Sequence, residues 1–332
     1  MRSPGASGTV LVLGNVFTLF SVVHYGYNRV HSFMQKTLTS WLYPLLIALC
    51  MGLLSVPRAN AVPLVIAQVS DRPKKDFKQL RPMVDYMASR MADLGFDRGE
   101  VRLFPSVDAL IEAIQKGQVH WITETPYTAA RLIREAKARA IVKKLKNGQR
   151  EYQTLIYVRA DSPFHTLADL VNQRIAFEHT ASFSSYFLPR QIITSQGLNL
   201  IELDHHSDPV PQGRIGYLFS RNEKNNVLWV DKGLVQAGAL NNGDWQNPER
   251  VPTSVREHLR VIHRSALYPR AFELTTPALS DAAAQRLQDT LLAMGSPQRS
   301  LLLRYEDTEG FEPVGPRDHL FLEQLLSEGA RP

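Results

Sequence analysis

The amino-acid sequence predicts an α/β protein of two lobes, each a mostly parallel sheet flanked by helices, with a cleft between the lobes. Apolar segments of strand length alternate with amphipathic segments of helix length, an order that produces parallel sheets with helical crossovers. The alternation pauses at a long extended run, 152–164, and then restarts. A second extended run, 259–281, leads back toward the first half of the chain. Two sheets joined by two crossing segments are the simplest arrangement with this order.

The charge of the chain is unevenly distributed. Residues 1–61 of the 332 contain four basic residues and no acidic residue. The formal charge of +6 for the whole chain therefore falls to +2 for the remainder, which has 34 basic and 32 acidic residues. Because basic and acidic residues are nearly equal in number in this part of the chain, a nucleic-acid partner is not expected.

The segment 34–61 has the features of a secretory signal peptide. A basic residue, Lys36, precedes an apolar core, and the sequence Ala-Asn-Ala at 59–61 is typical of a cleavage site. We expect cleavage after Ala61, which gives an exported chain that begins at Val62. Another apolar stretch precedes Met34, and a signal peptide does not normally have such a prefix. We therefore expect translation to start at Met34, and the alternative is a genuine extension with a further membrane segment.

The only cysteine, Cys50, lies inside this leader. Leu49 precedes it, whereas a lipoprotein signal needs a small residue there, so we expect no lipid anchor. The exported chain has no cysteine, which excludes disulfides and thiol catalysis. Its roughly 270 residues are enough to bury a stabilising core.

The first half of the exported chain alternates strands and helices. Apolar runs rich in β-branched residues predict buried strands, and apolar residues at helical spacing predict helices. We expect strands over 63–70, 100–106 and 119–125, and helices over 77–96 and 106–118. Ser106 is the expected N-cap of the second helix and Gly117 its C-cap. The basic run 134–150 is expected to form a solvated face or turn.

The second half repeats the pattern. We expect strands over 173–179, 200–206, 215–220 and 236–242, and helices over 166–170, 185–198, 226–233, 248–259 and 281–295. Ligand sites favour the interface of two lobes and the carboxyl ends of parallel strands. This predicts a binding cleft between the lobes.

The loop "EHTASFSSYFLPR", 178–190, is the strongest candidate for a contact with a ligand. It joins the strand "RIAF" to a helix, and the start of a helix exposes unpaired N–H groups and a positive dipole end. Ser182, Ser184 and Ser185 add hydroxyl donors, a combination that suits a tetrahedral oxyanion. The alternative is that one serine caps the helix and the others are solvated.

The chain resembles the phosphonate/phosphite/phosphate-type periplasmic solute-binding proteins, the substrate-binding components of ABC importers. The resemblance is carried by "QLRPMVDYMASRM", "ALIEAIQKGQVHW", "DSPFHTLADLVNQRIAFEHTASFSSYFLPRQII", "LVQAGALNNGDW" and "VIHRSALYPRAFELTT". It implies the type 2 periplasmic-binding-protein fold. On this basis we expect lobe 1 to comprise 62–157 and 266–332, lobe 2 to comprise 158–265, and hinges near 156–160 and 264–269.

The resemblance also implies roles for individual residues. In the family, a Ser-Thr-Ser loop holds the phosphonate oxygens, a role that passes to Ser182 and Ser184, while Phe183 stands where the family has threonine. Other expected ligand contacts lie in the same loop, in the turn after the third strand, and at polar positions near the cleft. They are Ser185, Tyr186, Glu124, Thr125, Tyr127, Asn241 and Asn242. Glu124 stands where an aromatic residue is common, and it could pair with an ammonium group on the ligand or with a nearby arginine.

An enzyme is not expected. The chain has no G-x-S-x-G motif. His205 and His206 are adjacent on an expected strand, so their side chains point to opposite faces and suit no metal site. The resemblance implies instead a periplasmic protein without cofactor or metal, which captures a small oxyanion-bearing solute as a monomer and delivers it to the permease of an ABC importer. The alternative is a ligand-sensing protein of the same fold that docks on a membrane histidine kinase.

Overall fold

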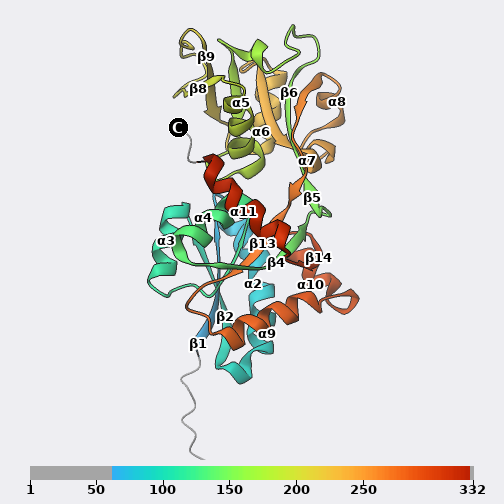
Figure 1. The fold of residues 1–332 in the computed structure, drawn as a ribbon. Helices are drawn as coiled ribbons and strands as arrows, with labels where there is room; N and C mark the ends of the chain where they lie inside the picture. Colours follow the sequence, from blue (N-terminus) through green and yellow to red (C-terminus); the bar gives the residue numbers. More distant parts are fainter. Residues whose placement is uncertain (1–61, 330–332) are drawn as a thin grey trace, which may run out of the picture. The chain divides into compact units, whose positions relative to one another are not determined.

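The computed structural model describes residues 62–329, with side chains to 325 (Figure 1). The expected leader, 1–61, and its cleavage site lie outside the described residues. The described part contains two six-stranded sheets and a short two-stranded sheet between them in the chain order. The first sheet belongs to lobe 1 and the second to lobe 2.

The sheet of lobe 1 has the strand order β14-β4-β13-β3-β1-β2. Its strands are β1 (Val62–Val69), β2 (Phe96–Phe104), β3 (Trp121–Glu124), β4 (Arg139–Lys146), β13 (Ala271–Thr275) and β14 (Thr308–Pro313). Strand β1 is parallel to β2 and β3, whereas β13 is antiparallel to β3 and β4, and β14 is antiparallel to β4. The sheet is therefore mixed rather than mostly parallel, because the chain that returns from lobe 2 inserts β13 against the direction of its neighbours.

Helices cover both faces of this sheet. They are α2 (Pro73–Arg90), η1 (Ala92–Leu94), α3 (Val107–Gln115), α4 (Pro126–Ala136), α9 (Asp281–Leu292), η4 (Ser296–Gln298), α10 (Arg299–Arg304) and α11 (Pro316–Gly329). Ser106 caps α3 as predicted, since its side chain accepts a hydrogen bond from the Ala109 N–H. Gly117 follows this helix with φ of 68°, a left-handed conformation that glycine adopts without strain.

The sheet of lobe 2 has the strand order β11-β6-β10-β7-β9-β8. Its strands are β6 (Thr154–Arg159), β7 (Arg174–Phe177), β8 (Asn199–Glu202), β9 (Arg214–Phe219), β10 (Ala237–Asn241) and β11 (Leu259–Arg264). Strands β8, β9, β7 and β10 are parallel, and the crossing strand β6 pairs antiparallel with β10 and β11. The surrounding helices are η2 (Ala168–Leu170), the π-helical turn η3 (Phe183–Phe187), α5 (Leu188–Ser195), α6 (Glu223–Asp231), α7 (Asn242–Gln246) and α8 (Thr253–Arg256).

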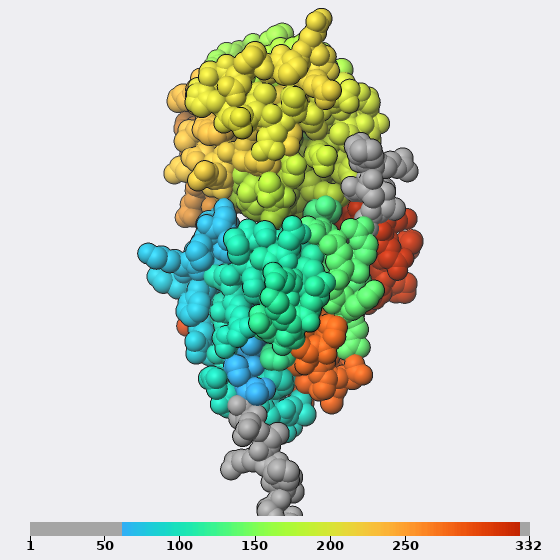
Figure 2. Space-filling model, turned by 90° about the vertical axis from the view of Figure 1, so that its left-hand side faces the viewer, coloured from blue at the N-terminus to red at the C-terminus, as the bar shows by residue number. Residues whose placement is uncertain are grey.

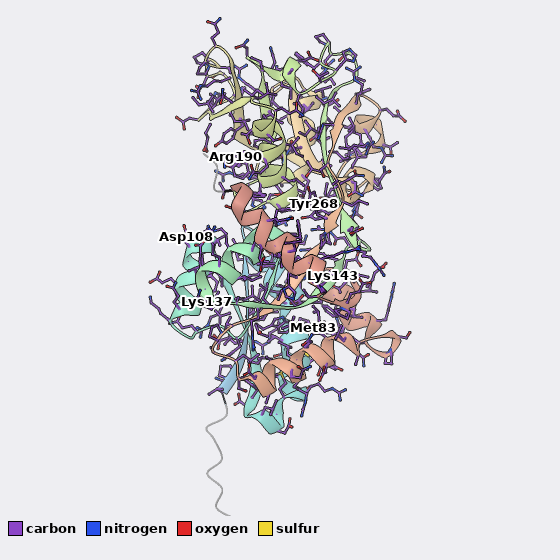
Figure 3. The ribbon with its side chains drawn as sticks, viewed as in Figure 1. Met83, Asp108, Lys137, Lys143, Arg190 and Tyr268 are labelled. Carbon is purple, nitrogen blue, oxygen red and sulfur yellow. The ribbon has the colours of Figure 1, made fainter. Side chains whose placement is uncertain are left out.

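Two crossing segments connect the lobes. Strand β5 (Glu151–Tyr152) pairs antiparallel with β12 (Tyr268–Pro269), which makes a two-stranded ribbon at the junction. Tyr268 marks this junction beside helix α11 (Figure 3), and its ring stacks on Phe321 with ring centroids 5.4 Å apart. The first crossing lies nearer the N-terminus than the expected hinge at 156–160, because β6 already belongs to the sheet of lobe 2 from Thr154 onward.

The basic run 134–150 differs most from its prediction. Instead of a solvated face or turn it forms the end of α4 and the interior strand β4, and Lys144 on this strand is only 1% exposed. The predicted helices over 166–170 and 248–259 shrink to single turns, η2 and α8. Asp169 accepts hydrogen bonds from the N–H groups of His165 and Thr166, so a tight turn replaces the helix start.

The two lobes contact each other along the face shown in Figure 2, where first-lobe segments in blue and teal meet second-lobe segments in yellow-green. One hydrophobic core cluster spans this junction, with Phe183 and Phe187 from lobe 2 and Leu322 from α11. Within residues 62–329, no helix combines the length and the apolar character that a membrane span requires.

Candidate ligand-binding site

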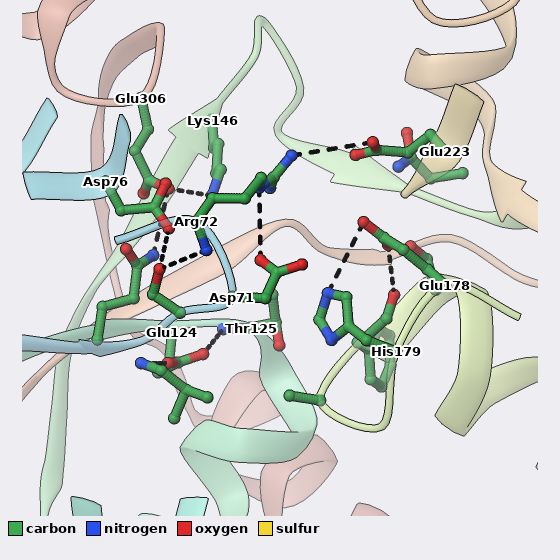
Figure 4. A pocket seen from close by; sticks show the side chains of 18 of the residues that line it. Asp71, Arg72, Asp76, Glu124, Thr125, Lys146, Glu178, His179, Glu223 and Glu306 are labelled. Carbon is green, nitrogen blue, oxygen red and sulfur yellow. Dashed lines mark hydrogen bonds and ion pairs between the residues drawn. The ribbon is translucent and has the colours of Figure 1, made fainter. Parts of the chain in front are cut away.

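A polar pocket lies between the two sheets, at the carboxyl ends of β1, β3, β7 and β10 (Figure 4). Its volume is about 230 Å³. Lobe 1 contributes the segment after β1 and the turn after β3, lobe 2 contributes the loop after β7, and the crossing segments contribute Tyr152 and Arg270. The position agrees with the rule that places ligands beyond the carboxyl ends of parallel strands.

Charged side chains dominate the lining of the pocket. The acidic ones are Asp71, Asp76, Glu124, Glu178, Glu223, Asp244 and Glu306, and the basic ones are Arg72, Lys75, Lys146, Arg250 and Arg270. A cleft for a bare anion would show an excess of positive charge, and this lining does not. The distribution of partners among these charges therefore matters more than their number.

The predicted loop lies in this pocket. Residues Glu178 through Ser184 line it, and the Ser182 hydroxyl accepts a hydrogen bond from the Ser185 N–H as the N-cap of η3. The same hydroxyl donates to Glu178 Oε2 at 3.0 Å, so its proton is already engaged. Ser184 uses its backbone carbonyl to accept from the Thr154 hydroxyl, while its own side chain lines the pocket.

Two other residues of the loop turn away from the pocket. The Ser185 hydroxyl donates to the Ala239 carbonyl and accepts from the Glu178 N–H at 3.0 Å, which ties the loop to β10. The Tyr186 ring packs edge-on against Phe177 and Phe219 in the core of lobe 2. Neither side chain lines the pocket, so we withdraw both as ligand contacts.

The prediction that Tyr127 and Asn242 contact the ligand is also wrong. The Tyr127 ring stacks on Phe187 with centroids 3.8 Å apart, in the hydrophobic cluster between the lobes rather than in the pocket. The Asn242 side chain accepts hydrogen bonds from the Gln153 N–H and from the Gln149 side chain, which attaches α7 to the crossing segment. Both side chains make structural contacts that hold the lobes and the crossing segments together.

Phe183 has a structural role that its sequence position does not suggest. It lines the pocket at the base of the loop, but its side chain is 1% exposed and packs near Tyr152, Phe187 and Tyr268. The aromatic ring therefore fixes the serine loop to the junction of the lobes. The hydroxyl of the family's threonine is replaced by a packing contact.

The turn after β3 and the start of α7 complete the predicted set. Glu124, Thr125 and Asn241 all line the pocket. Glu124 accepts hydrogen bonds from the N–H groups of Val69, at 2.7 Å, and of Thr125. Burial raises the pKa of Glu124 to about 7 despite these bonds. Asn241 caps α7, since its side chain accepts from the Asp244 N–H.

On the lobe 1 side, a buried charge network supports the pocket. Glu306 accepts from the ammonium groups of Lys144 and Lys146 and from the Gln68 side chain. These lysines hold the pKa of Glu306 well below its usual range although burial opposes this. Behind it, Glu273 accepts from the Trp121 indole and the Tyr305 hydroxyl and lies 3.5 Å from Lys144.

On the lobe 2 side, Glu178 and Asp244 are poorly compensated, whereas Glu223 has arginine partners. Burial, followed by repulsion from Glu223 and Asp244, raises the pKa of Glu178 to about 8. Glu223 lies 3.4 Å from Arg250 and 3.9 Å from Arg72 of lobe 1, and this last contact crosses the cleft (Figure 4). Burial and the charge of Glu223 also raise the pKa of Asp244.

Sequence reasoning missed the cations of the pocket. Arg72 follows β1, Lys146 ends β4, and Arg270 separates β12 from β13. Arg72 follows a strand that was predicted, so its position at a strand end was a usable signal. Lys146 gave no such signal, because its strand lies in the run that was predicted to be solvated. Nothing in the local sequence distinguishes Arg270 from the exposed arginines of the chain.

Comparison with known families decides the class of the protein. The sequence profile of a family described as "ABC transporter, phosphonate, periplasmic substrate-binding protein" matches residues 66–319. The chain belongs to this family. The predicted resemblance is thereby confirmed, and the type 2 periplasmic-binding-protein fold with it. Members of this substrate-binding family are components of a transporter and act in the periplasm, so a small-molecule ligand and a membrane permease are the partners that membership implies.

Solved structures agree with this family. XAC2383 from Xanthomonas citri, solved bound to chloride ion and bound to ATP, is 32% and 31% identical in the two structures, with TM-scores of 0.77 and 0.76. Each match covers 80% of this chain and 96% of that one. No curated protein sequence matches this chain.

More distant structures share the fold of this periplasmic substrate-binding family. A binding protein component of an ABC phosphonate transporter (PA3383) from Pseudomonas aeruginosa is 17% identical with a TM-score of 0.60, over 80% of this chain and 86% of that one. PhnD1 from Prochlorococcus marinus, in complex with methylphosphonate, is 13% identical with a TM-score of 0.61, over 81% and 98%.

The chemistry of the pocket suits binding. Across the described residues there is no group of three or more His, Cys, Asp or Glu side chains arranged to hold a metal ion. The hydroxyls, N–H groups, buried acids and buried cations of the pocket are all suited to hydrogen bonds and ion pairs with a charged solute.

Proposed function

We propose that this member of the family captures a small solute that carries a phosphonate-, phosphite- or phosphate-like oxyanion, as a monomer exported through the leader 34–61, and delivers it to an ABC importer. The observation that carries the proposal is the position of the loop 178–184. It lines a pocket between two lobes, opposite the segment after β1, in a chain of the phosphonate-binding family. An oxyanion at this loop would receive hydroxyl and N–H donors.

The charges of the pocket refine the solute class. Glu178, Glu223 and Asp244 gather on the lobe 2 side. Burial raises the pKa of Glu178 and of Asp244, whereas the charges of Arg250 and Arg72 help to lower the pKa of Glu223 against its burial. A positive group on the solute would relieve this cost, whereas a bare dianion would increase it. We therefore propose a zwitterionic solute, with an oxyanion at one end and an ammonium group at the other.

The size of the pocket favours a small solute. Its volume of about 230 Å³ lies below the roughly 300–1,000 Å³ that is usual for pockets for drug-sized ligands. The ATP found in XAC2383 is larger than a small phosphonate and carries three phosphates. The seven acidic side chains that line this pocket would repel those phosphates. ATP is therefore a comparison ligand rather than the solute that we propose.

A thermal-shift screen tests this function. The panel comprises phosphate, phosphite, methylphosphonate, 2-aminoethylphosphonate, a sulfonate, a simple alkylamine and ATP. A solute with Kd of about 1 μM, added at about 100 μM, stabilises the folded protein by roughly 2.7 kcal/mol. We expect the largest rise in melting temperature with 2-aminoethylphosphonate, a smaller rise with methylphosphonate, and none with the alkylamine alone.

The outcomes separate the parts of the proposal. If the alkylamine alone raises the melting temperature, the oxyanion assignment is wrong. If ATP does so and no small oxyanion does, the assignment of a small solute is wrong. If methylphosphonate binds as tightly as 2-aminoethylphosphonate, the oxyanion part survives and the zwitterion part fails. Genes for a permease and an ATPase beside this gene favour import, whereas a histidine kinase gene there would contradict it.

A further inference from the structure

Arg270 is a buried cation without a buried anion to match it. Its side chain is 8% exposed and lines the pocket. Among the residues whose side chains the structure describes, no carboxylate lies within salt-bridge distance of its guanidinium, and its Nε has no hydrogen-bond partner. Removing a guanidinium from water without a paired counter-charge is costly, so an anion bound from outside the chain would stabilise Arg270 here.

Tyr152 presents a second incompletely satisfied polar atom at the same place. The side chain is 1% exposed, and its buried hydroxyl makes no hydrogen bond of full geometry, although Arg270 and Ser184 lie close to it. The Arg270 guanidinium carbon lies 4.4 Å from the centroid of the Tyr152 ring, so the two side chains are in cation–π contact. Burial raises the pKa of Tyr152, while Arg270 and Ser184 oppose this shift, which locates both close to the phenol.

The two residues come from the two crossing segments. Tyr152 ends β5, and Arg270 follows β12, the partner of β5 in the two-stranded ribbon. Phe183 packs against Tyr152 and Tyr268, which brings the serine loop of lobe 2 up to this ribbon. Donors from the crossings and from lobe 2 therefore converge on one corner of the pocket.

The neighbouring charges are mixed. Lys146 adds positive charge from lobe 1, although Glu306 pairs with it. The charge of Arg270 acts on Asp244, because it opposes the rise in the Asp244 pKa. The two side chains nevertheless form no ion pair. The Ser182 hydroxyl donates to Glu178, so it is less available than Ser184. Arg270 is thus the strongest uncommitted donor at this corner.

We propose that the guanidinium of Arg270, the hydroxyl of Tyr152 and the hydroxyl of Ser184 form the subsite that binds the oxyanion of the solute. A tetrahedral phosphonate or phosphate group accepts two parallel N–H bonds from arginine, and the remaining oxygens accept from the hydroxyls. This inference rests on the proposed function and deepens it. It places the principal charge for the oxyanion at the junction of the lobes, on residues that the serine loop alone does not supply.

Calorimetric titration of the purified protein with phosphate, methylphosphonate and 2-aminoethylphosphonate tests the subsite. Arg270→Gln should weaken binding of these oxyanions about 10- to 100-fold, and Arg270→Lys, which keeps the charge but not the paired N–H groups, should be intermediate. Tyr152→Phe keeps the ring and should weaken binding by about 3- to 10-fold. The control is Arg260→Gln, a partly buried arginine outside the pocket that donates to the carbonyls of Ser162 and Phe164; it should leave affinity unchanged within about twofold.

Each outcome decides one point. If the wild-type protein binds none of the three oxyanions, the proposed function fails and the subsite with it. If the wild type binds while Arg270→Gln and Tyr152→Phe bind equally well, the function stands and this subsite is wrong. Because Arg270→Gln also alters packing, unfolding of every variant is measured without ligand. If Tyr152→Phe unfolds like the wild type and yet loses affinity, the subsite is supported independently of stability.

Discussion

Two sets of buried carboxylates face each other across the cleft, and they differ in their partners rather than in their burial. Glu306 of lobe 1 is 6% exposed and Glu178 of lobe 2 is 8% exposed. Two lysines hold the pKa of Glu306 well below its usual range, whereas burial and neighbouring acids raise the pKa of Glu178 to about 8. The lobe 1 wall is thus neutralised around Glu306. The lobe 2 wall carries an uncompensated cost at Glu178, which is the pattern expected of a group that completes its charge balance with a ligand.

The largest effect is expected from removing the carboxylate of Glu306 from the lobe 1 wall. Glu306→Gln removes the carboxylate that Lys144 and Lys146 share and leaves a fully buried ammonium group with only the more distant Glu273. We expect the free energy of unfolding to fall by about 3–5 kcal/mol, measured by urea denaturation at pH 7.

The matched control for this change is an exposed pair in the same lobe. Arg81 and Asp85 lie one helical turn apart on α2 and are both largely solvated, so Arg81→Gln should cost no more than about 0.5 kcal/mol. If Glu306→Gln costs as little as the control, the network contributes no more than a surface pair and the contrast between the two walls is lost.

Removal of a carboxylate from the lobe 2 wall should change stability in the opposite direction. The pKa of Glu178 is about 8 in the folded protein, so the carboxyl keeps its proton up to that pH, whereas in the unfolded chain it releases the proton near its ordinary pKa of 4.5. Between these values the folded state binds more protons, so its stability falls as pH rises. Glu178→Gln removes this term and should be more stable than the wild type at pH 8, on the order of 2 kcal/mol, with the difference shrinking toward pH 5.

Thermal unfolding at several pH values measures this difference, with Glu249→Gln, an exposed acid of lobe 2, as the variant that should follow the wild type. A Glu178→Gln protein that loses stability at pH 8 would mean that the carboxylate is stabilising, as in lobe 1. The glutamine can still accept the hydrogen bond from Ser182, so loss of that bond does not confound the result.

The contrast also explains which features the sequence could predict. Strands and helices with strong periodicity were predicted correctly, including the start of α3 at Ser106, because local spacing and capping determine them. The loop 178–190 was located for the same reason, since a strand followed by serines and a helix is a local pattern. The part of the loop that faces the pocket was not predictable, because Ser184 and Ser185 are adjacent and their orientations depend on the π-helical turn.

Pairing between distant residues was invisible in the sequence. The run around Lys144 has the composition of a solvated segment, and only the approach of Glu273 and Glu306, more than 120 residues away, makes an interior strand possible. Arg270 was missed for the converse reason. Its importance lies in the partners that it lacks, and a missing partner leaves no trace in the local sequence.

The smallest expected effect concerns the ion pair between Arg72 and Glu223, which joins the two walls. Arg72 of lobe 1 approaches Glu223 of lobe 2 to 3.9 Å, and the Arg72 side chain is 38% exposed while that of Glu223 is 11% exposed, so the pair is long and solvated on its arginine side. Arg72→Gln should therefore change the free energy of unfolding by less than about 1 kcal/mol. The same substitution removes a cation that faces the acidic wall, so small-angle scattering of the ligand-free protein should show more separated lobes. A loss of stability as large as that of Glu306→Gln would place Arg72 among the structural partners, and the acids of lobe 2 would then be compensated by the protein itself rather than reserved for a solute.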